Sequence, residues 1–327
     1  QKVFKIEQLI LLGGKRKAEL AVAKSNTKLA EIEFEKLILE LQKKLHHTMA
    51  QVFEQQKLVD VYNNQYQLVQ NLVTEYEKQA SKGNIALKEV VRLKGALLQL
   101  NTTRSELITD YLENQENLQV LLRSNDDVKP LLTEADYQNY IKLVSLSDLQ
   151  NKILQYNPEL KEAQEQTVLA QAILYNEKKQ RIPNITLMAN YDQNSGAYAN
   201  EINGGIAMDL PFFNRNKGNI KAAKYKLDQA NTNNEAVKQS IVLSLQKQWK
   251  LYQNAISEYK TSQNLYSSDF DLVNKGMGEN FQKRNLSILE FLDFFDTYNQ
   301  SIQEITRIKI QLVEQSENLK TLLGNEF

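Results

Sequence analysis

The sequence predicts a mainly α-helical chain with a small β part, built from a duplicated unit of strand, long helix, tight turn and long helix. Only 11 of the 327 residues are Gly and 4 are Pro. None of these helix breakers lies within 15–82, 96–129, 219–275 or 279–323. We therefore expect four long helices. A helix of about 60 residues spans roughly 90 Å, so the sequence predicts an elongated molecule.

The duplication rests on two pairs of similar segments. Residues 17–30 resemble residues 217–230, and residues 84–89 resemble residues 285–290. The spacing between partners is nearly the same in both pairs, which indicates a duplication with little change in length. Chance similarity of helical composition is the alternative.

The breakers and the hydrophobic periodicity predict the domain boundaries. Each long helical hairpin reverses at a turn, the first at Ser81–Asn84 and the second within Lys275–Asn280, where glycines permit a sharp reversal. In the region between the repeats, Ser147 with Gln150 predicts a capping box, and Asn157 before Pro158 predicts the start of another helix. The predicted domains are a first repeat over 1–123 (strand 3–12, hairpin 15–123, tip near 81–86), a linker over 124–158, and a second repeat over 159–327 (helix 159–181, strands 185–192 and 205–213, hairpin 217–323, tip near 275–286).

Two strands of the second repeat alternate apolar and polar residues. Ile185, Leu187 and Tyr191 share one face of the first strand, and Ile206 and Met208 share one face of the second. Strands of 8–10 residues are roughly long enough to cross a bilayer when tilted. Two such strands cannot close a sheet alone, and lipid does not tolerate open edges, so a membrane-spanning sheet would need strands from other copies.

Composition excludes several classes of function. Lys and Arg total 40, as do Asp and Glu, and this balance argues against nucleic-acid binding. Cysteine is absent, which excludes disulfides, zinc–thiolate sites and a catalytic thiol. No run of 18 apolar residues and no enzyme motif is present. The only histidines, His46 and His47, are neighbours that face different ways on a helix. We therefore predict no enzyme, no catalytic residue, no cofactor and no metal site.

Three segments carry a resemblance to a known family. They read NPELKEAQEQTVLAQAILYNEKKQRIPNITLMANYD (157–192), MDLPFFNRNKGNIKAAKYKL (208–227) and EQLILLGGKRKAELAVAK (7–24). They resemble TolC-like outer-membrane efflux proteins, and the Gly13–Arg16 and Pro211–Asn216 forms look most like the heavy-metal branch. The first helix and first strand of that family have no counterpart here, so we expect an N-terminal portion to be missing.

The resemblance implies a fold and a function. Three copies would form a transmembrane β-barrel in the outer membrane of a Gram-negative bacterium, continued into the periplasm by an α-helical tunnel. The homotrimer would contact outer-membrane lipid, a periplasmic adaptor protein and an inner-membrane pump of the resistance–nodulation–division type. It would conduct metal cations or small toxic compounds passively. The sequence does not select between these cargoes.

The resemblance also points to a gate. Glu290, Asp293 and Asp296 are spaced three residues apart just after the second turn, near the position of acidic residues at the tunnel entrance of the family. A ring of carboxylates would favour cations, and mutual repulsion would raise some of the pKa values. The alternative is a solvated helix face.

Two further sets of residues are expected to be surfaces for contact. The residues at the hairpin tips would dock the adaptor. The simpler explanation of the same residues is ordinary capping of the helices at a turn. Aromatic residues near the strand ends would lie at the membrane interface, although packing at the strand–helix junction explains them equally well. The tip residues are Gly83, Asn84, Ile85, Leu87, Asn285, Leu286 and Ser287, and the interface residues are Tyr191, Phe212 and Phe213.

The other class of function compatible with long hairpins is a periplasmic coiled-coil adaptor or scaffold without channel activity. An adaptor of that kind should show one hairpin flanked by Gly-rich β-lobes. This sequence shows two hairpins and no such lobes, which favours the channel.

Overall fold

The computed structural model describes residues 2–195, 198–210, 213, 215–265, 269–283 and 285–324. Phe212, one of the predicted interface residues, lies outside the described residues. The chain forms two compact units, one of Gln1–Leu37 with Asn151–Leu243 and one of Ile38–Gln150 with Ser244–Phe327. Each unit combines parts of both predicted repeats, because two long helices run from one unit into the other.

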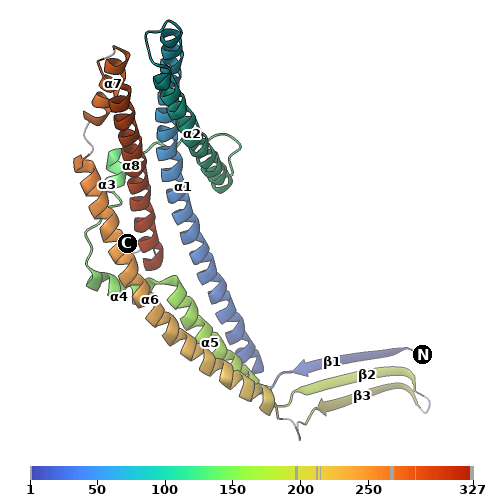
Figure 1. Ribbon diagram of the computed structural model, residues 1–327. Helices are drawn as coiled ribbons and strands as arrows, with labels where there is room; N and C mark the ends of the chain where they lie inside the picture. The colour runs from blue at the N-terminus through green and yellow to red at the C-terminus, as the bar shows by residue number, and fades with distance from the viewer. Residues whose placement is uncertain are drawn as a thin grey trace. The chain divides into compact units, whose positions relative to one another are not determined.

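Eight helices and three strands make up the described chain (Figure 1). In chain order they are β1 (Val3–Ile10), α1 (Lys15–Ser81), α2 (Leu87–Leu122), α3 (Glu134–Gln138), α4 (Leu146–Tyr156), α5 (Pro158–Lys179), β2 (Ile185–Ser195), β3 (Tyr198–Met208), α6 (Lys217–Leu265), α7 (Asp269–Gln282) and α8 (Ile288–Leu323). The mainly α chain with a small β part is as the sequence predicts.

The first hairpin has the predicted bounds, but the turn of the second was placed wrongly. Gly276 and Gly278 lie inside α7, and the chain reverses only after Gln282. A glycine inside a helix costs about 1 kcal/mol, which packing can offset. At Gly278 a Cβ atom would make an ordinary van der Waals contact with Leu68 of α1 (3.4 Å), so this glycine lies in a helix–helix contact and not in a turn. The predicted single outbound helix is described as α6 and α7.

Local capping explains where the shorter helices begin. Asn157 caps α5 as predicted, because its Oδ1 accepts a hydrogen bond from the Leu160 amide at 2.8 Å. The predicted cap of α4 was wrong. Ser145, not Ser147, accepts from the Asp148 amide (3.2 Å) and donates to the Asp148 carboxylate (2.6 Å).

The strands form one antiparallel sheet in the order β1–β2–β3. Ile6 pairs with Ala189 and Leu187 pairs with Ile206, so side chains from all three strands share each face. The third strand begins at Tyr198 and ends at Met208, earlier than the predicted 205–213. Pairing with β2 provides the backbone hydrogen bonds that extend the strand into a polar stretch with weak strand propensity.

The core of the second unit lies between α1, α2, α7 and α8. It is rich in aromatic side chains: Tyr76 stacks on Phe281 (5.5 Å between centroids), Phe281 stacks on Phe291 (4.3 Å), and Phe291 lies tilted against Phe295 (5.6 Å). Such pairs add to the free energy of burial. This aromatic cluster joins α7 and α8 to the end of α1.

Candidate functional site

The two hairpin turns share one hydrogen-bonding pattern. The amide of Asn84 donates to the Gln79 carbonyl, and the amide of Asn285 donates to the Asn280 carbonyl, both at 2.9 Å. The side chain of each Asn also donates to the side-chain oxygen of the same partner, at 2.8 Å and 3.4 Å. The first turn further requires Gly83, whose φ of +75° favours glycine. Equivalent bonds at equivalent positions support the duplication.

The second turn is followed by a full capping box. Ser287 accepts a hydrogen bond from the Glu290 amide (3.2 Å), and the Glu290 carboxylate accepts from the amide (2.9 Å) and hydroxyl (2.7 Å) of Ser287. The hydroxyl and amide of Ser287 lower the pKa of Glu290, because they stabilise the carboxylate. In the single chain this is opposite to the increase expected from repulsion in a ring of carboxylates.

The structure places the three predicted gate residues in different surroundings. Glu290, Asp293 and Asp296 are all exposed on α8. Steps of three residues rotate around a helix by about 60° each, so Glu290 and Asp296 point about 120° apart. Glu290 engages Ser287, whereas Asp296 lines a groove shared with α1 and α2. Asp293 lies between them.

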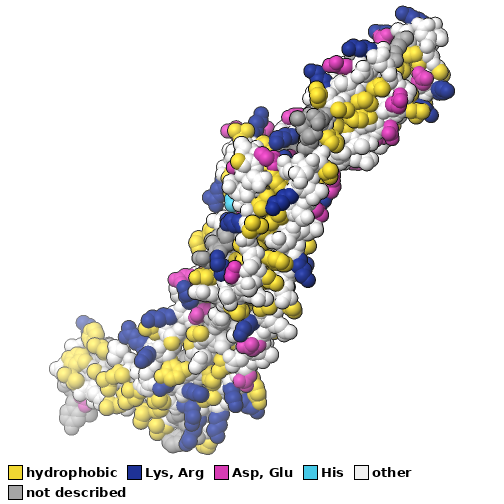
Figure 2. Space-filling model, turned by 90° about the vertical axis from the view of Figure 1, so that its left-hand side faces the viewer, with side chains coloured by type: hydrophobic (Ala, Val, Ile, Leu, Met, Phe, Trp, Pro, Cys, Tyr) yellow, Lys and Arg dark blue, Asp and Glu magenta, His cyan; other side chains and the backbone are white. Residues whose placement is uncertain are grey.

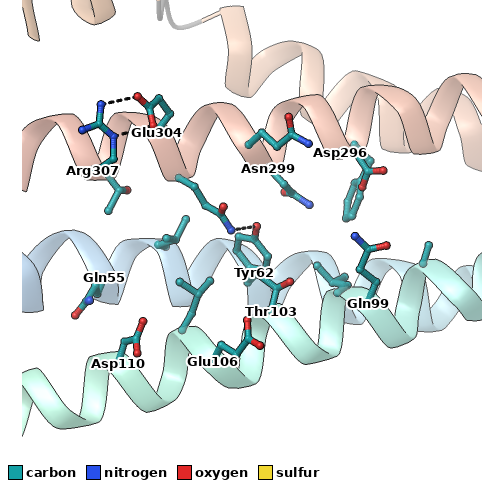
Figure 3. Close-up of a pocket in the computed structure, with 18 of the residues that line it drawn as sticks. Gln55, Tyr62, Gln99, Thr103, Glu106, Asp110, Asp296, Asn299, Glu304 and Arg307 are labelled. Atoms are coloured by element: carbon teal, nitrogen blue, oxygen red, sulfur yellow. Dashed lines mark hydrogen bonds and ion pairs between the residues drawn. The ribbon is translucent and has the colours of Figure 1, made fainter. Parts of the chain in front are cut away.

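This α1–α2–α8 groove has a volume of about 1290 Å³. Figure 3 shows polar side chains entering it from all three helices. Sequence reasoning missed it, because it forms between helices far apart in the chain. Its polar lining includes Gln55 and Tyr62 from α1, Gln99, Thr103, Glu106 and Asp110 from α2, and Asp296, Asn299, Gln303, Glu304 and Arg307 from α8.

Hydrogen bonds order the middle of the groove. Gln303 donates to the hydroxyl of Tyr62 at 2.7 Å, and burial raises the pKa of Tyr62 to about 12. Arg307 pairs with Glu304 (2.6 Å), which lowers the pKa of the Glu304 carboxyl. Both interactions appear as dashed lines in Figure 3. Asn299 is buried, and its Oδ1 has no partner among the described residues. The exposed carboxylates of Glu106, Asp110 and Asp296 are the groups of the groove that can accept hydrogen bonds from solutes or a partner.

A partly buried ionic network holds the linker against the long helices. Tyr137 of α3 donates to the buried Glu54 carboxylate of α1 (2.8 Å), and Lys309 of α8 lies 3.4 Å from Glu134 of α3. Glu134 also accepts from Tyr259 of α6. Burial and the neighbouring Glu54 raise the pKa of Tyr137, so the phenol stays a donor. A sequence signal existed: Glu54 interrupts an apolar series spaced by four residues.

The sheet has one apolar and one polar face. Every side chain of β1 is exposed. The apolar face also holds Gln8 and Gly204, and its apolar side chains are Phe4, Ile6, Ile10, Ile185, Leu187, Ala189, Tyr191, Ile202, Ile206 and Met208. Figure 2 shows hydrophobic side chains gathered over the strands, in the lower part of the view. The ring centroid of the predicted interface residue Tyr191 lies 6.4 Å from that of Phe4. Phe213, also predicted to lie at the interface, is fully exposed. Such a face is typical of contact with an apolar medium.

In the first unit, the chain passes from a strand to a long helix twice, before α1 and before α6. These two junctions resemble each other, as the two hairpin tips do. Gly14 and Asn216 both adopt a left-handed φ (+77° and +54°) immediately before α1 and α6. Lys15 donates to Asn184 at 2.7 Å, and Asn216 donates to Glu177 at 2.6 Å. These bonds fasten the start of α1 to the segment between α5 and β2, and the residue before α6 to α5 itself.

The described residues include neither a candidate membrane-spanning helix nor a candidate metal cluster. No helix among them is both apolar and long enough to cross a membrane. No group of three or more His, Asp and Glu side chains in the same residues is placed to hold a metal ion.

Comparisons with known proteins agree on the fold. No curated protein is significantly similar in sequence. Among solved structures, the channel-forming protein CusC superposes with a TM-score of 0.77 at 17% identity, covering 98% of this chain and 76% of CusC. VceC of Vibrio cholerae gives 0.74 at 14% (98% and 79%), and the outer membrane channel CmeC of Campylobacter jejuni gives 0.75 at 16% (99% and 70%).

The family is settled by sequence. The pattern of the outer membrane efflux proteins matches residues 149–325, more than half of the chain. The match spans α5, the β2–β3 pair and the whole second hairpin, which are the elements that carry the sheet face, the second tip and one wall of the groove. The chain belongs to the outer membrane efflux protein family.

Proposed function

We propose that three copies of the chain form the outer-membrane channel of a tripartite efflux pump. Family membership already places the chain in the outer membrane and in efflux. The observation that carries the proposal is the sheet, which exposes one apolar face and leaves β1 and β3 as open edges. Lipid would cover the face, and strands from other copies would pair with the edges.

A channel of this kind performs no covalent chemistry. It needs a polar path, a constriction and surfaces for its partners. Extraction of the protein with detergent, followed by mass measurement, tests the assembly. A detergent-dependent trimer with single-channel conductance in planar bilayers is the expected result. A water-soluble monomer without conductance would overturn the proposal and favour the scaffold.

Glu290, Asp293 and Asp296 form the cation-selective entrance in this proposal. All three carboxylates are solvent-accessible at the start of α8, next to the second tip. Rings of carboxylates raise the local concentration of cations. Reversal potentials should show lower cation selectivity when all three are changed to the neutral amides. Glu290→Gln is the right substitution, because Gln still closes a capping box. Unchanged selectivity would remove these residues from the gate.

The hairpin tips are the adaptor-docking surface in this proposal, and the inner-membrane pump of the resistance–nodulation–division type connects through that adaptor. Leu87 at the first tip and Leu289 beside the second are exposed apolar side chains next to the ordered turns. Leu87→Ser should weaken adaptor binding in a pull-down from detergent. Leu131→Ser, on the linker, is the matched control, because Leu131 is also a highly exposed leucine. Equal binding by both variants would contradict docking at the tip.

The cargo in this proposal is metal cations or small toxic compounds. The motifs at the crossings resemble the heavy-metal branch. Expression of the chain with its cognate adaptor and pump in a host lacking its own channel should restore tolerance to one class of compound. Tolerance to metal salts but not to dyes would identify metal cations as the cargo. Tolerance to dyes but not to metal salts would identify small toxic compounds.

A further inference from the structure

The chain gathers basic residues at one end of the sheet. The paired residues Ile10, Ile185 and Met208 mark this end, where β1 and β3 end and β2 begins. The three segments that lie next to it in the chain are 13–28, 175–184 and 213–227. Together they hold 13 of the 40 Lys and Arg residues but only 2 of the 40 Asp and Glu residues. A chain with no net charge therefore has a strongly basic region at this end of the sheet.

Most of these cations face solvent. Ten of the 13 are exposed, and no Asp or Glu of the described chain forms an ion pair with them. The other three, Lys15, Lys28 and Lys179, each have a partner within the chain. Figure 2 shows Lys and Arg side chains beside the hydrophobic ones in the lower part of the view. The exposed set, here called the basic cluster, consists of Arg16, Lys17, Lys24, Lys178, Arg181, Arg215, Lys217, Lys221, Lys224 and Lys226.

Part of the basic cluster lies where it does not favour folding. The N-terminus of a helix carries a partial positive charge, so acidic residues stabilise the first turn and basic residues destabilise it. The first turns of α2, α4, α5 and α8 each contain an acidic residue, whereas those of α1 and α6 contain none. Lys17 and Lys217 lie there instead, at equivalent positions of the two repeats. An anion bound at these helix starts would compensate both the helix ends and the cations.

The basic cluster adjoins the apolar face of the sheet. Leu11 and Leu210, just beyond the ends of β1 and β3, are exposed, and exposed cations follow a few residues later at Arg16 and Arg215. Apolar side chains beside Lys and Arg are typical of a membrane surface, where the long stems lie along apolar groups and the charged heads reach the headgroups.

The depth of the basic cluster agrees with this position. The headgroup layer on each side of a bilayer is roughly 5–8 Å thick, and one turn of helix rises about 5.4 Å. When lipid covers the sheet face, the first turns of α1 and α6 therefore lie among the headgroups. Lys217, Lys221 and Lys224 are spaced by four and three residues, so they share one face of α6. Such a row reaches several neighbouring headgroups.

We propose that the basic cluster binds the phosphate groups of anionic phospholipids in the periplasmic leaflet of the outer membrane. The inference rests on the proposed function, because it starts from a sheet that lipid covers. Arg and Lys form charge-assisted hydrogen bonds with phosphate oxygens. A zwitterionic headgroup has no net charge, so a cluster of unpaired cations prefers an anionic lipid.

Native mass spectrometry of the detergent-solubilised protein tests this preference. Phosphatidylglycerol and phosphatidylcholine with the same acyl chains are the two probes. The unsubstituted protein should bind phosphatidylglycerol more tightly than phosphatidylcholine. The triple variant Lys217→Gln, Lys221→Gln, Lys224→Gln should bind phosphatidylglycerol about tenfold more weakly and phosphatidylcholine as before. Replacing the same three residues by Arg should retain the binding.

The matched control is the triple variant Lys247→Gln, Lys250→Gln, Lys260→Gln. These lysines are also exposed on α6, they lie beyond the basic cluster, and the change in net charge is the same. This control should bind phosphatidylglycerol like the unsubstituted protein. Thermal melting in detergent without added lipid separates binding from a structural role. The cluster variant should melt no lower than the unsubstituted protein, because it removes cations from the start of α6.

Several outcomes would overturn the proposal. They are equal binding of phosphatidylglycerol by the two Gln variants, and equal binding of the two lipids by the unsubstituted protein. A changed reversal potential in planar bilayers without weaker lipid binding would place these lysines in the conduit instead. Conducting trimers without a lipid preference would leave the channel proposal standing. Absence of trimers and of conductance in the unsubstituted protein would overturn the channel proposal itself.

Discussion

The two hairpin tips share an Asn amide-to-carbonyl hydrogen bond but differ in their surroundings. Leu87 and Ile288 occupy equivalent positions after the turn, yet Leu87 is 71% exposed and Ile288 only 7%. The second tip has the Ser287 capping box, whereas Ala86 at the first provides no side-chain cap. The two copies of the duplicated unit thus share the hydrogen bonding of the turn and differ in which side chains beside it are exposed. The first tip offers an apolar side chain for contact, and the second is held by the aromatic cluster.

The largest effect should come from removing the centre of that cluster. Phe281 is fully buried and stacks on both Tyr76 and Phe291. Phe281→Ala should lower the free energy of unfolding by about 3–5 kcal/mol, because it removes apolar contacts and leaves a cavity. Thermal melting followed by circular dichroism measures this loss. A change below about 1 kcal/mol would show that the second tip does not depend on the cluster.

A matched pair of substitutions tests the comparison itself. Ile288→Ala should cost about 2–5 kcal/mol, since the side chain is buried. Leu87→Ala should stay within about 0.5 kcal/mol, as is usual for exposed positions. Denaturant unfolding of both variants gives the difference. Equal losses at the two positions would mean that the tips are stabilised alike and that their exposure does not distinguish them.

Exchanging the caps should shift stability in opposite directions. Ser287→Ala removes the cap of α8 and should cost about 1 kcal/mol, whereas Ala86→Ser gives α2 a cap and should gain about 0.5 kcal/mol. Melting temperatures of both variants and of the double variant provide the measurement. A lower melting temperature for Ala86→Ser would show that the backbone of the first tip cannot use a capping side chain.

The smallest effect should be a pH dependence at the second tip. The pKa of Glu290 is lower in the folded chain than in the unfolded chain, so its charge stabilises the fold above the unfolded pKa. This contribution is lost as the pH falls through the folded pKa. Glu290→Gln should therefore melt below the unsubstituted protein above about pH 5, and the two should converge in acid. A difference that persists in acid would assign the effect to something other than this carboxylate.

Local patterns were enough to predict much of the fold. The absence of breakers, the alternation in the strands and the Gly83 turn all act within a few residues, so α1, α2, β1 and the first tip appear close to their predicted bounds. The capping of α5 by Asn157 is local in the same sense. The gate and docking roles of the predicted residues remain predictions, because they concern partners and other copies.

The sequence by itself determined long helical rods, short alternating strands and their duplication, because helix breaking, strand alternation and capping depend on near neighbours. Only the tertiary structure decided which glycines turn and which pack. It also decided which of two equivalent tip residues is buried, and how Glu54, Tyr137 and Lys309 meet around the linker. Those outcomes depend on contacts between residues far apart in the chain: Gly278 of α7 lies against Leu68 of α1, and Ile288 is buried in the cluster that α1, α2, α7 and α8 form together.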